Sequence, residues 1–156
     1  SVMAYGEHTG RFLSGGAVTP GESFDAEDIT VQRTRTINPN GAAFLFGHPS
    51  FRGHLRRVKC LQNYIESGVT AIEPNFQLDD YEVSGNVIKC GSEHGAIHCW
   101  RRSTGGRIVD NIRIEEPAGK PVVAVGAPRG WENPDPPVLR NNRNLLSDPI
   151  GEQPPQ

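Results

Sequence analysis

The chain has 156 residues, a low hydrophobic share of 35% and a high content of turn residues, with 18 Gly and 13 Pro. This length suits one domain with one core, built from short elements joined by frequent turns. The formal charge of −2 is too close to neutral for a protein that binds nucleic acid by neutralising phosphates. No apolar run reaches the ~20 residues of a membrane span and no secretory signal opens the chain, so we expect a soluble protein with no nucleic-acid or membrane partner.

In chain order, residues 1–28 are rich in Gly and lack strand alternation, so we expect an irregular N-terminal segment that caps the rest of the chain. From residue 29, four segments share one order: apolar strand, polar corner, second strand, Gly turn, third strand. These segments read ITVQRTRTINPNGAAFLFGHP, RRVKCLQNYIESGVTAIEP, YEVSGNVIKCGSEHGAIHCW and GRIVDNIRIEEPAGKPVVAVGAP, with PPVLRNNRNLL as a partial fifth. The stretch RGWENPDPP carries three prolines and is expected to be a loop, and the polar, Pro-rich residues 147–156 a flexible tail.

The repeat is also visible in two landmark residues. Glycines 41, 68, 95 and 119 are separated by 27, 27 and 24 residues, and asparagines 63, 86 and 111 by 23 and 25. Each strand alternates apolar and polar residues, the period of a half-buried strand, whereas Gly or Pro interrupts every stretch long enough for a helix. An antiparallel sandwich has no reason to repeat Asn and Gly at one point of each unit, but a solenoid does, because identical positions stack from coil to coil.

These observations predict an all-β protein, a short right-handed parallel β-helix of about four to five coils over residues 29–146. An Asn at a sharp corner tolerates left-handed backbone angles and can bond the Asn of the next coil. The predicted ladder is Asn63, Asn86, Asn111 and Asn141, with Asp110 or Asn142 as alternatives in the last coils. The predicted core columns are Val58, Val83 and Ile108, and Ile72, Cys99 and Val125.

The segments VSGNVIKC and RIVDNIRI, each with a turn Asn between two apolar strands, resemble the repeat of the pectate-lyase-like superfamily of right-handed parallel β-helices. The resemblance covers roughly residues 29–146. It implies the fold, and it implies carbohydrate as the ligand class, because that superfamily includes polysaccharide lyases, glycoside hydrolases, virion tailspikes and non-catalytic modules.

A candidate carbohydrate-binding strip emerges when the strands after each Gly turn are aligned. This alignment directs Ala43, Leu45, Thr70, Ile72, Ile97, Cys99, Val123 and Val125 inward. It directs Phe44, Phe46, Ala71, Glu73, His98, Trp100 and Ala124 outward. Aromatic planes stack on sugar rings and charged groups fix hydroxyls, so the predicted binding residues are Phe44, Phe46, Glu73, His98 and Trp100, with Arg101 and Arg102 contacting acidic sugars. The alternative is that a loop or the N-terminal segment covers these aromatics.

Catalytic residues are harder to assign. Glycoside hydrolysis needs two carboxylates, and Glu66 and Glu93 each precede a turn glycine by two residues on neighbouring coils. The resemblance to lyases implies instead that Asp79, Asp80 and Glu82 hold Ca²⁺ while Arg101, Arg102 or Lys89 acts as the base. Solvated surface side chains are the alternative for each set, and no other cofactor or metal is predicted.

Three cysteines, Cys60, Cys90 and Cys99, show neither a disulfide framework nor zinc spacing. Buried free thiols are the favoured interpretation, with Cys90 near a turn, and one disulfide with a spare thiol is the alternative.

Two functions remain open. The first is a carbohydrate-associated β-helix that binds an extracellular polysaccharide, or cleaves one, such as a uronate-containing polymer, as a lyase or hydrolase. The second is a non-catalytic tailspike-like or adhesin-like module that assembles through its coil ends or a lateral face. Either function implies an extracellular, cell-surface or virion-associated location.

Overall fold

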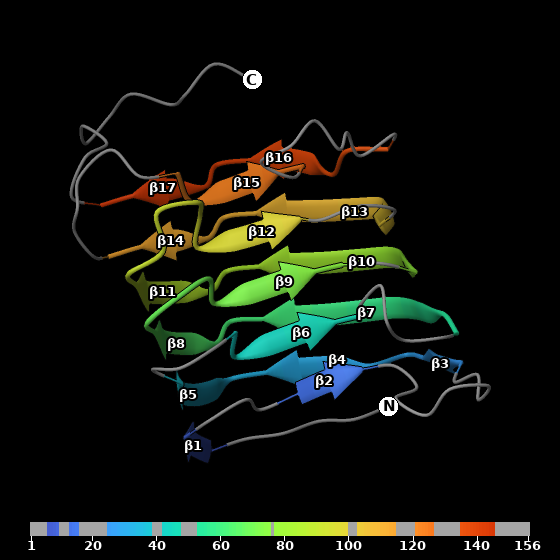
Figure 1. Cartoon of the computed structure of the whole chain (residues 1–156), viewed down its shortest axis with the longest axis horizontal. Coiled ribbons are helices and arrows are strands. Elements are labelled where there is room, and N and C mark those ends of the chain that lie inside the picture. Colours follow the sequence, from blue (N-terminus) through green and yellow to red (C-terminus); the bar gives the residue numbers. More distant parts are fainter. Residues whose placement is uncertain are drawn as a thin grey trace.

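The computed structural model describes residues 6–9, 13–15, 25–38, 42–47, 53–75, 77–99, 103–114, 121–126 and 135–145. All elements in these ranges are β-strands, and every strand pair is parallel. The strands form three sheets that stack coil upon coil around a common axis (Figure 1). The predicted parallel β-helix is therefore confirmed.

Sheet 1 contains β3 (Ala26–Glu27), β4 (Thr30–Gln32), β7 (Leu55–Leu61), β10 (Leu78–Ser84), β13 (Ser103–Val109) and β16 (Val138–Arg140). Sheet 2 contains β1 (Gly6–Thr9), β5 (Thr34–Asn38), β8 (Tyr64–Ser67), β11 (Val87–Cys90), β14 (Ile112–Arg113) and β17 (Arg143–Asn144). Sheet 3 contains β2 (Leu13–Gly15), β6 (Phe44–Phe46), β9 (Ile72–Pro74), β12 (Ile97–Cys99) and β15 (Val123–Val125).

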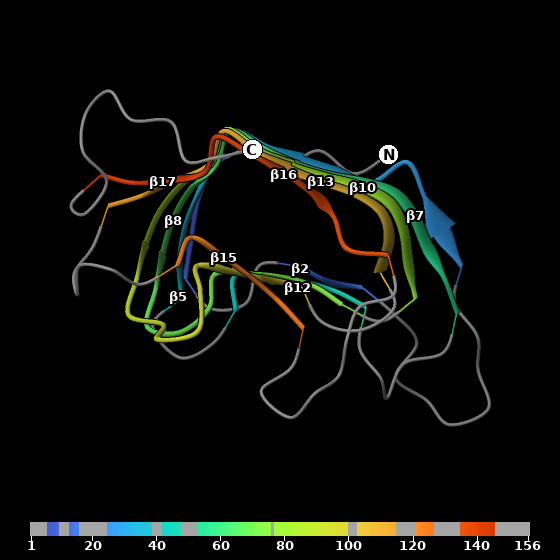
Figure 2. The same ribbon diagram turned by 90° about the horizontal axis from the view of Figure 1, so that it is seen from above.

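Within each coil the chain passes from sheet 1 to sheet 2 to sheet 3. Seen from above in Figure 2, this path runs anticlockwise while the chain rises towards the viewer, so the coil is right-handed. The regular part, from β7 to β15, makes about three turns, slightly fewer than the four to five coils predicted. In the coil before it, the long strand of sheet 1 is split into the short strands β3 and β4.

The strands β1 and β2 lie within residues 1–28, which we expected to be irregular. They pair with β5 and β6 and extend sheets 2 and 3 at the N-terminal end. The predicted tail, residues 147–156, lies outside the described residues, as do Trp131 and the rest of the predicted loop before residue 135.

A sharp corner joins sheet 1 to sheet 2 in every coil. Its residues adopt left-handed backbone angles with φ between 53° and 64°, and they are Arg33, Gln62, Gly85, Asp110 and Asn141. The next residue turns its side chain into the core, and in three consecutive coils it is Asn63, Asn86 and Asn111.

The predicted ladder is confirmed at these three positions. Asn86 donates its backbone N–H and its Nδ2 to Asn111 Oδ1 at 3.1 and 2.9 Å, and Asn63 bonds Asn86 in the same way. The last rung is Asn142, the alternative, and not Asn141, because Asn141 occupies the left-handed corner. At the other end Thr34 replaces Asn and bonds Asn63 Oδ1 through its N–H and hydroxyl.

The core columns are confirmed in part. Val83 stacks on Ile108 as predicted, but its other neighbour is Cys60, while Val58 stacks on Tyr81. The prediction was wrong for Val58 because it used a 25-residue step throughout, whereas the step from Cys60 to Val83 is 23 residues and only the step from Val83 to Ile108 is 25. In the second predicted column Cys99 stacks on Val125, but the prediction was wrong for Ile72, which stacks on Ile97 and not on Cys99.

All three cysteines are buried and free, which confirms the favoured interpretation, and Cys90 is the last residue of its strand. Burial raises the pKa of the Cys60 thiol, and it raises that of Cys99 to about 12.

One buried charge was not anticipated. Arg113, on β14 of sheet 2, is fully buried and in register with Ile88. Its guanidinium donates to the backbone carbonyls of Cys90, Ser92 and Pro121 at 3.0, 2.8 and 3.1 Å. Arg113 therefore clamps the turns between sheets 2 and 3 in two successive coils, although its Nε has no partner in the described part of the chain.

Candidate functional site

The predicted aromatic strip is wrong at its first two residues. Phe44 pairs with Ile72, so both Phe44 and Phe46 point inward, where they are 0% and 1% exposed and their rings stack at 6.3 Å. The alignment of the first coil was shifted by one residue. The two large rings fill the core next to β2. Burying their apolar surface stabilises the fold far more than leaving them exposed to solvent would.

The other residues of the strip divide into two groups. Glu73 and His98 do lie on the outward side of sheet 3, in the row that contains Leu45 and Ala124. Leu45 and His98 are nevertheless only 4% exposed, so this side of the sheet is closed to solvent at both positions. Trp100, Arg101 and Arg102 lie outside the described residues.

His98 is held by the protein itself. One ring nitrogen, Nε2, lies 2.6 Å from the carbonyl oxygen of Gly126. Burial lowers the pKa of His98, although the bond to Gly126 opposes this shift. A buried, bonded imidazole in this position stabilises the turn after β15, and the described geometry gives it no access to a polymer.

The two candidate acids do not occupy matching positions. Glu66 is in register with Lys89 on the next coil, whereas Glu93 lies in the exposed turn after β11. The prediction aligned Gly68 with Gly95, but the structure aligns Gly68 with Gly91, whose N–H bonds Ser67 O at 3.2 Å. Glu66 also accepts a hydrogen bond from Tyr64 at 3.1 Å and pairs with Arg35 at 3.5 Å.

The candidate calcium ligands belong to the long strand of sheet 1. Asp79 and Glu82 lie on its outward face, and Asp80 occupies the left-handed bulge at φ 54°. Within the described ranges, no three His, Cys, Asp or Glu side chains gather closely enough to hold a metal ion. The predicted calcium site therefore has no support from the described geometry.

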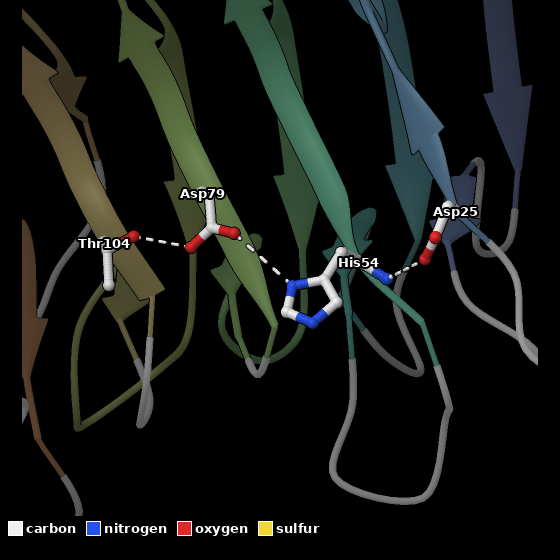
Figure 3. A network of polar contacts seen from close by, with 4 residues as sticks. All are labelled: Asp25, His54, Asp79 and Thr104. Atoms are coloured by element: carbon white, nitrogen blue, oxygen red, sulfur yellow. Dashed lines mark hydrogen bonds and ion pairs between the residues drawn. The ribbon is translucent and has the colours of Figure 1, made fainter.

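Asp79 instead belongs to a row of polar side chains that crosses four successive coils. The row consists of Asp25, His54, Asp79 and Thr104, and Figure 3 shows it running along the start of the long strands. Asp25 Oδ1 accepts the backbone N–H of His54 at 2.8 Å, His54 Nδ1 lies 3.4 Å from Asp79 Oδ2, and Thr104 donates its hydroxyl to Asp79 Oδ1. We call these four residues the polar row.

The polar row leaves one ring nitrogen unused. When Nδ1 of His54 donates to the Asp79 carboxylate, the neutral imidazole carries an acceptor at Nε2. Figure 3 shows Nε2 pointing away from both aspartates, and it bonds no polar group in the described part of the chain. The His54 and Asp79 side chains are 47% and 36% exposed, so a ligand in solvent can reach them.

Charged residues continue the same outward face. Lys59, Glu82 and Arg107 lie in register on β7, β10 and β13, which places a cation, an anion and a cation at the strand spacing of about 4.8 Å. Nearer the N-terminal end, Arg57 bonds Asp28 at 2.7 and 3.0 Å. The outward face of sheet 1 is therefore polar and mixed in charge.

Sequence reasoning found Asp79 but missed the other members of the polar row. The available signal was the repeat, because His54, Asp79 and Thr104 are each 25 residues apart and Asp25 precedes His54 by 29. In the described residues, no helix has the length and apolar character needed to cross a membrane. Comparison of the chain with family models, curated proteins and solved structures found no match in any of the three.

Proposed function

We propose that the protein binds an extended polysaccharide along the outward face of sheet 1, across the polar row. The observation that carries this proposal is the row itself: polar groups from four consecutive coils follow the solenoid axis, and His54 offers an unused ring nitrogen to solvent. Groups repeated at the strand spacing suit a ligand made of repeated, hydroxyl-rich units, because each unit meets a similar set of donors and acceptors.

The charge of the face fits this ligand class. Cations and anions alternate along Lys59, Glu82 and Arg107, so the face neither attracts nor repels a polymer of one sign as a whole. Individual arginines there can bind uronate carboxylates. The likeness of the repeat to the pectate-lyase-like superfamily supports the same ligand class by analogy, and the function implies an extracellular, cell-surface or virion-associated location.

Binding to a panel of neutral and uronate-containing polysaccharides, measured by affinity electrophoresis and calorimetry, tests the proposal. His54→Ala and Asp79→Ala should each weaken binding roughly two- to twelvefold, since one hydrogen bond contributes about 0.5–1.5 kcal/mol. His94→Ala, which removes an exposed imidazole from the turn between sheets 2 and 3, is the matched control and should bind like the parent. Absence of binding across the panel, or equal affinity of the two row variants and the parent, contradicts the proposal.

Assaying the best-bound polysaccharide for new reducing ends and unsaturated products then asks whether binding leads to cleavage. The polar row offers a His–Asp pair that could transfer a proton, so His54→Ala should abolish any cleavage that is found.

A further inference from the structure

The two ends of the solenoid differ. At the N-terminal end the inward residues Val31 and Phe44 are fully buried, and β1 and β2 are the edge strands of sheets 2 and 3. At the C-terminal end Leu139, which continues the Val83–Ile108 column, is 47% exposed, Val125 39% and Leu145 56%. The last strands of the three sheets, β15, β16 and β17, all lie at this end (Figure 1).

The backbone hydrogen bonds that join each coil to the next also end there. In each earlier coil the ladder residue donates its backbone N–H to the Asn Oδ1 of the next coil, ending with Asn111 on Asn142 at 3.1 Å. The corner residue likewise donates its N–H to a carbonyl of the next coil, ending with Asp110 on Arg140 at 3.0 Å. The N–H groups of Asn141 and Asn142 have no acceptor in the described part of the chain. This end therefore presents apolar side chains together with unpaired backbone donors.

We propose that the C-terminal end binds the C-terminal end of a second copy, forming a closed two-fold dimer. Head-to-tail stacking would require a matching apolar surface at the N-terminal end, but Val31, the inward residue of the edge strand β4, is 0% exposed there. Two copies then meet through the apolar end that both expose, which is an isologous contact.

The charges at this end fit a two-fold arrangement. The exposed segment that contains β16 is acidic at its start, at Asp135, and basic at its end, at Arg140. One carboxylate oxygen of Asp135, Oδ2, accepts the N–H of Gly105 at 2.9 Å, which fixes the side chain at this edge. A two-fold axis normal to sheet 1 makes the two β16 strands antiparallel and brings Asp135 of one copy towards Arg140 of the other. A parallel arrangement would place like charges together, and opposite charges across paired strands are favourable.

Sedimentation velocity and light scattering of the 156-residue chain over a range of concentrations test the dimer. The parent should show a monomer–dimer equilibrium with no larger species. Leu139→Lys should raise the dissociation constant roughly tenfold or more, because it places charge at the centre of the contact. Val69→Lys is the matched control: Val69 is also exposed, at 44%, but it lies in a turn of an inner coil and should have no effect.

A charge exchange tests the orientation. Arg140→Asp should weaken the dimer, and adding Asp135→Lys to it should restore association, because the exchanged pair attracts again. Circular dichroism verifies folding of each variant, and Leu145→Lys replaces Leu139→Lys if the latter does not fold. A parent that stays monomeric, oligomers that grow without limit, or equal effects of Val69→Lys and Leu139→Lys would each overturn the proposal.

Discussion

Removing the central rung of the asparagine ladder should destabilise the protein strongly. Asn86 is fully buried, and its side chain accepts the N–H of Asn63 at 2.9 Å and donates to the carbonyl of Cys60 at 3.0 Å. In Asn86→Ala the buried N–H of Asn63 loses its acceptor and the buried carbonyl of Cys60 loses a donor. Each such group costs about 1–3 kcal/mol, so the free energy of unfolding should fall by roughly 2–6 kcal/mol. That is a large part of the roughly 5–15 kcal/mol typical of a domain.

Urea unfolding followed by circular dichroism measures this change. Lys89→Ala, exposed on the strand that comes after Asn86, is the control and should stay within about 0.5 kcal/mol of the parent. Asn142→Ala should cost clearly less than Asn86→Ala, because its rung lies at the open end, where water can replace the lost bonds. A loss below about 1 kcal/mol for Asn86→Ala, or an equal loss for Asn142→Ala, would refute this account of the ladder.

Four other predictions concern the core and the closed side of sheet 3. Val83→Asp should prevent folding, as judged by circular dichroism, because it places an unpaired charge in a column where Val83 is 1% exposed. Gly106→Ala should be destabilising, since its new Cβ would overlap the phenol ring of Tyr81, and adding Tyr81→Val should recover part of the loss in urea unfolding. The Cys99 thiol, buried and with its pKa raised to about 12, should react with a thiol reagent at about pH 8 far more slowly in the native than in the denatured protein. Burial lowers the pKa of His98, so just below the ordinary pKa of 6.5 the unfolded state binds more protons than the folded state. The free energy of unfolding should therefore be highest above this pH and should decline as the pH falls through it. His98→Gln should reduce this decline, as measured by thermal unfolding at several pH values.

The fold was predictable because its strongest sequence signal is a polar residue at a position where an apolar strand would otherwise continue. An Asn between two apolar strands, repeated at a near-constant interval, has few explanations other than a stacked corner, and Asn63, Asn86 and Asn111 form that corner. Glycine was a poorer guide. Glycines occur wherever a turn is tight, and each turn can have a different length.

Unequal turn lengths caused the errors in the candidate site. The path from sheet 2 to sheet 3 takes five residues from Ser67 to Ile72 but seven from Cys90 to Ile97, although both ends are in register. Counting back from a turn glycine therefore placed Glu93 opposite Glu66. Only the hydrogen-bonded register of the strands could correct this alignment.

The polar row and Arg113 escaped prediction for opposite reasons. Outward residues such as His54 and Thr104 carry no apolar pattern, so only the interval between them connects them. Arg113 carries a misleading pattern, since a charged residue in a strand normally faces solvent. Its burial depends on three carbonyls from turns that the strand pattern does not describe.

Dimerisation through the open end would let the polar rows of both copies bind the same ligand. The row follows the solenoid axis along sheet 1, and the open end lies across that axis (Figures 1 and 3). A two-fold dimer joined through β16 would extend sheet 1 from one copy into the next, so that both rows lie on one continuous outward face. A polymer long enough to reach both rows would then bind more tightly than a short one, because its second contact is intramolecular. Leu139→Lys should abolish this dependence on polymer length while leaving the affinity for short oligosaccharides unchanged, whereas His54→Ala should weaken the binding of both.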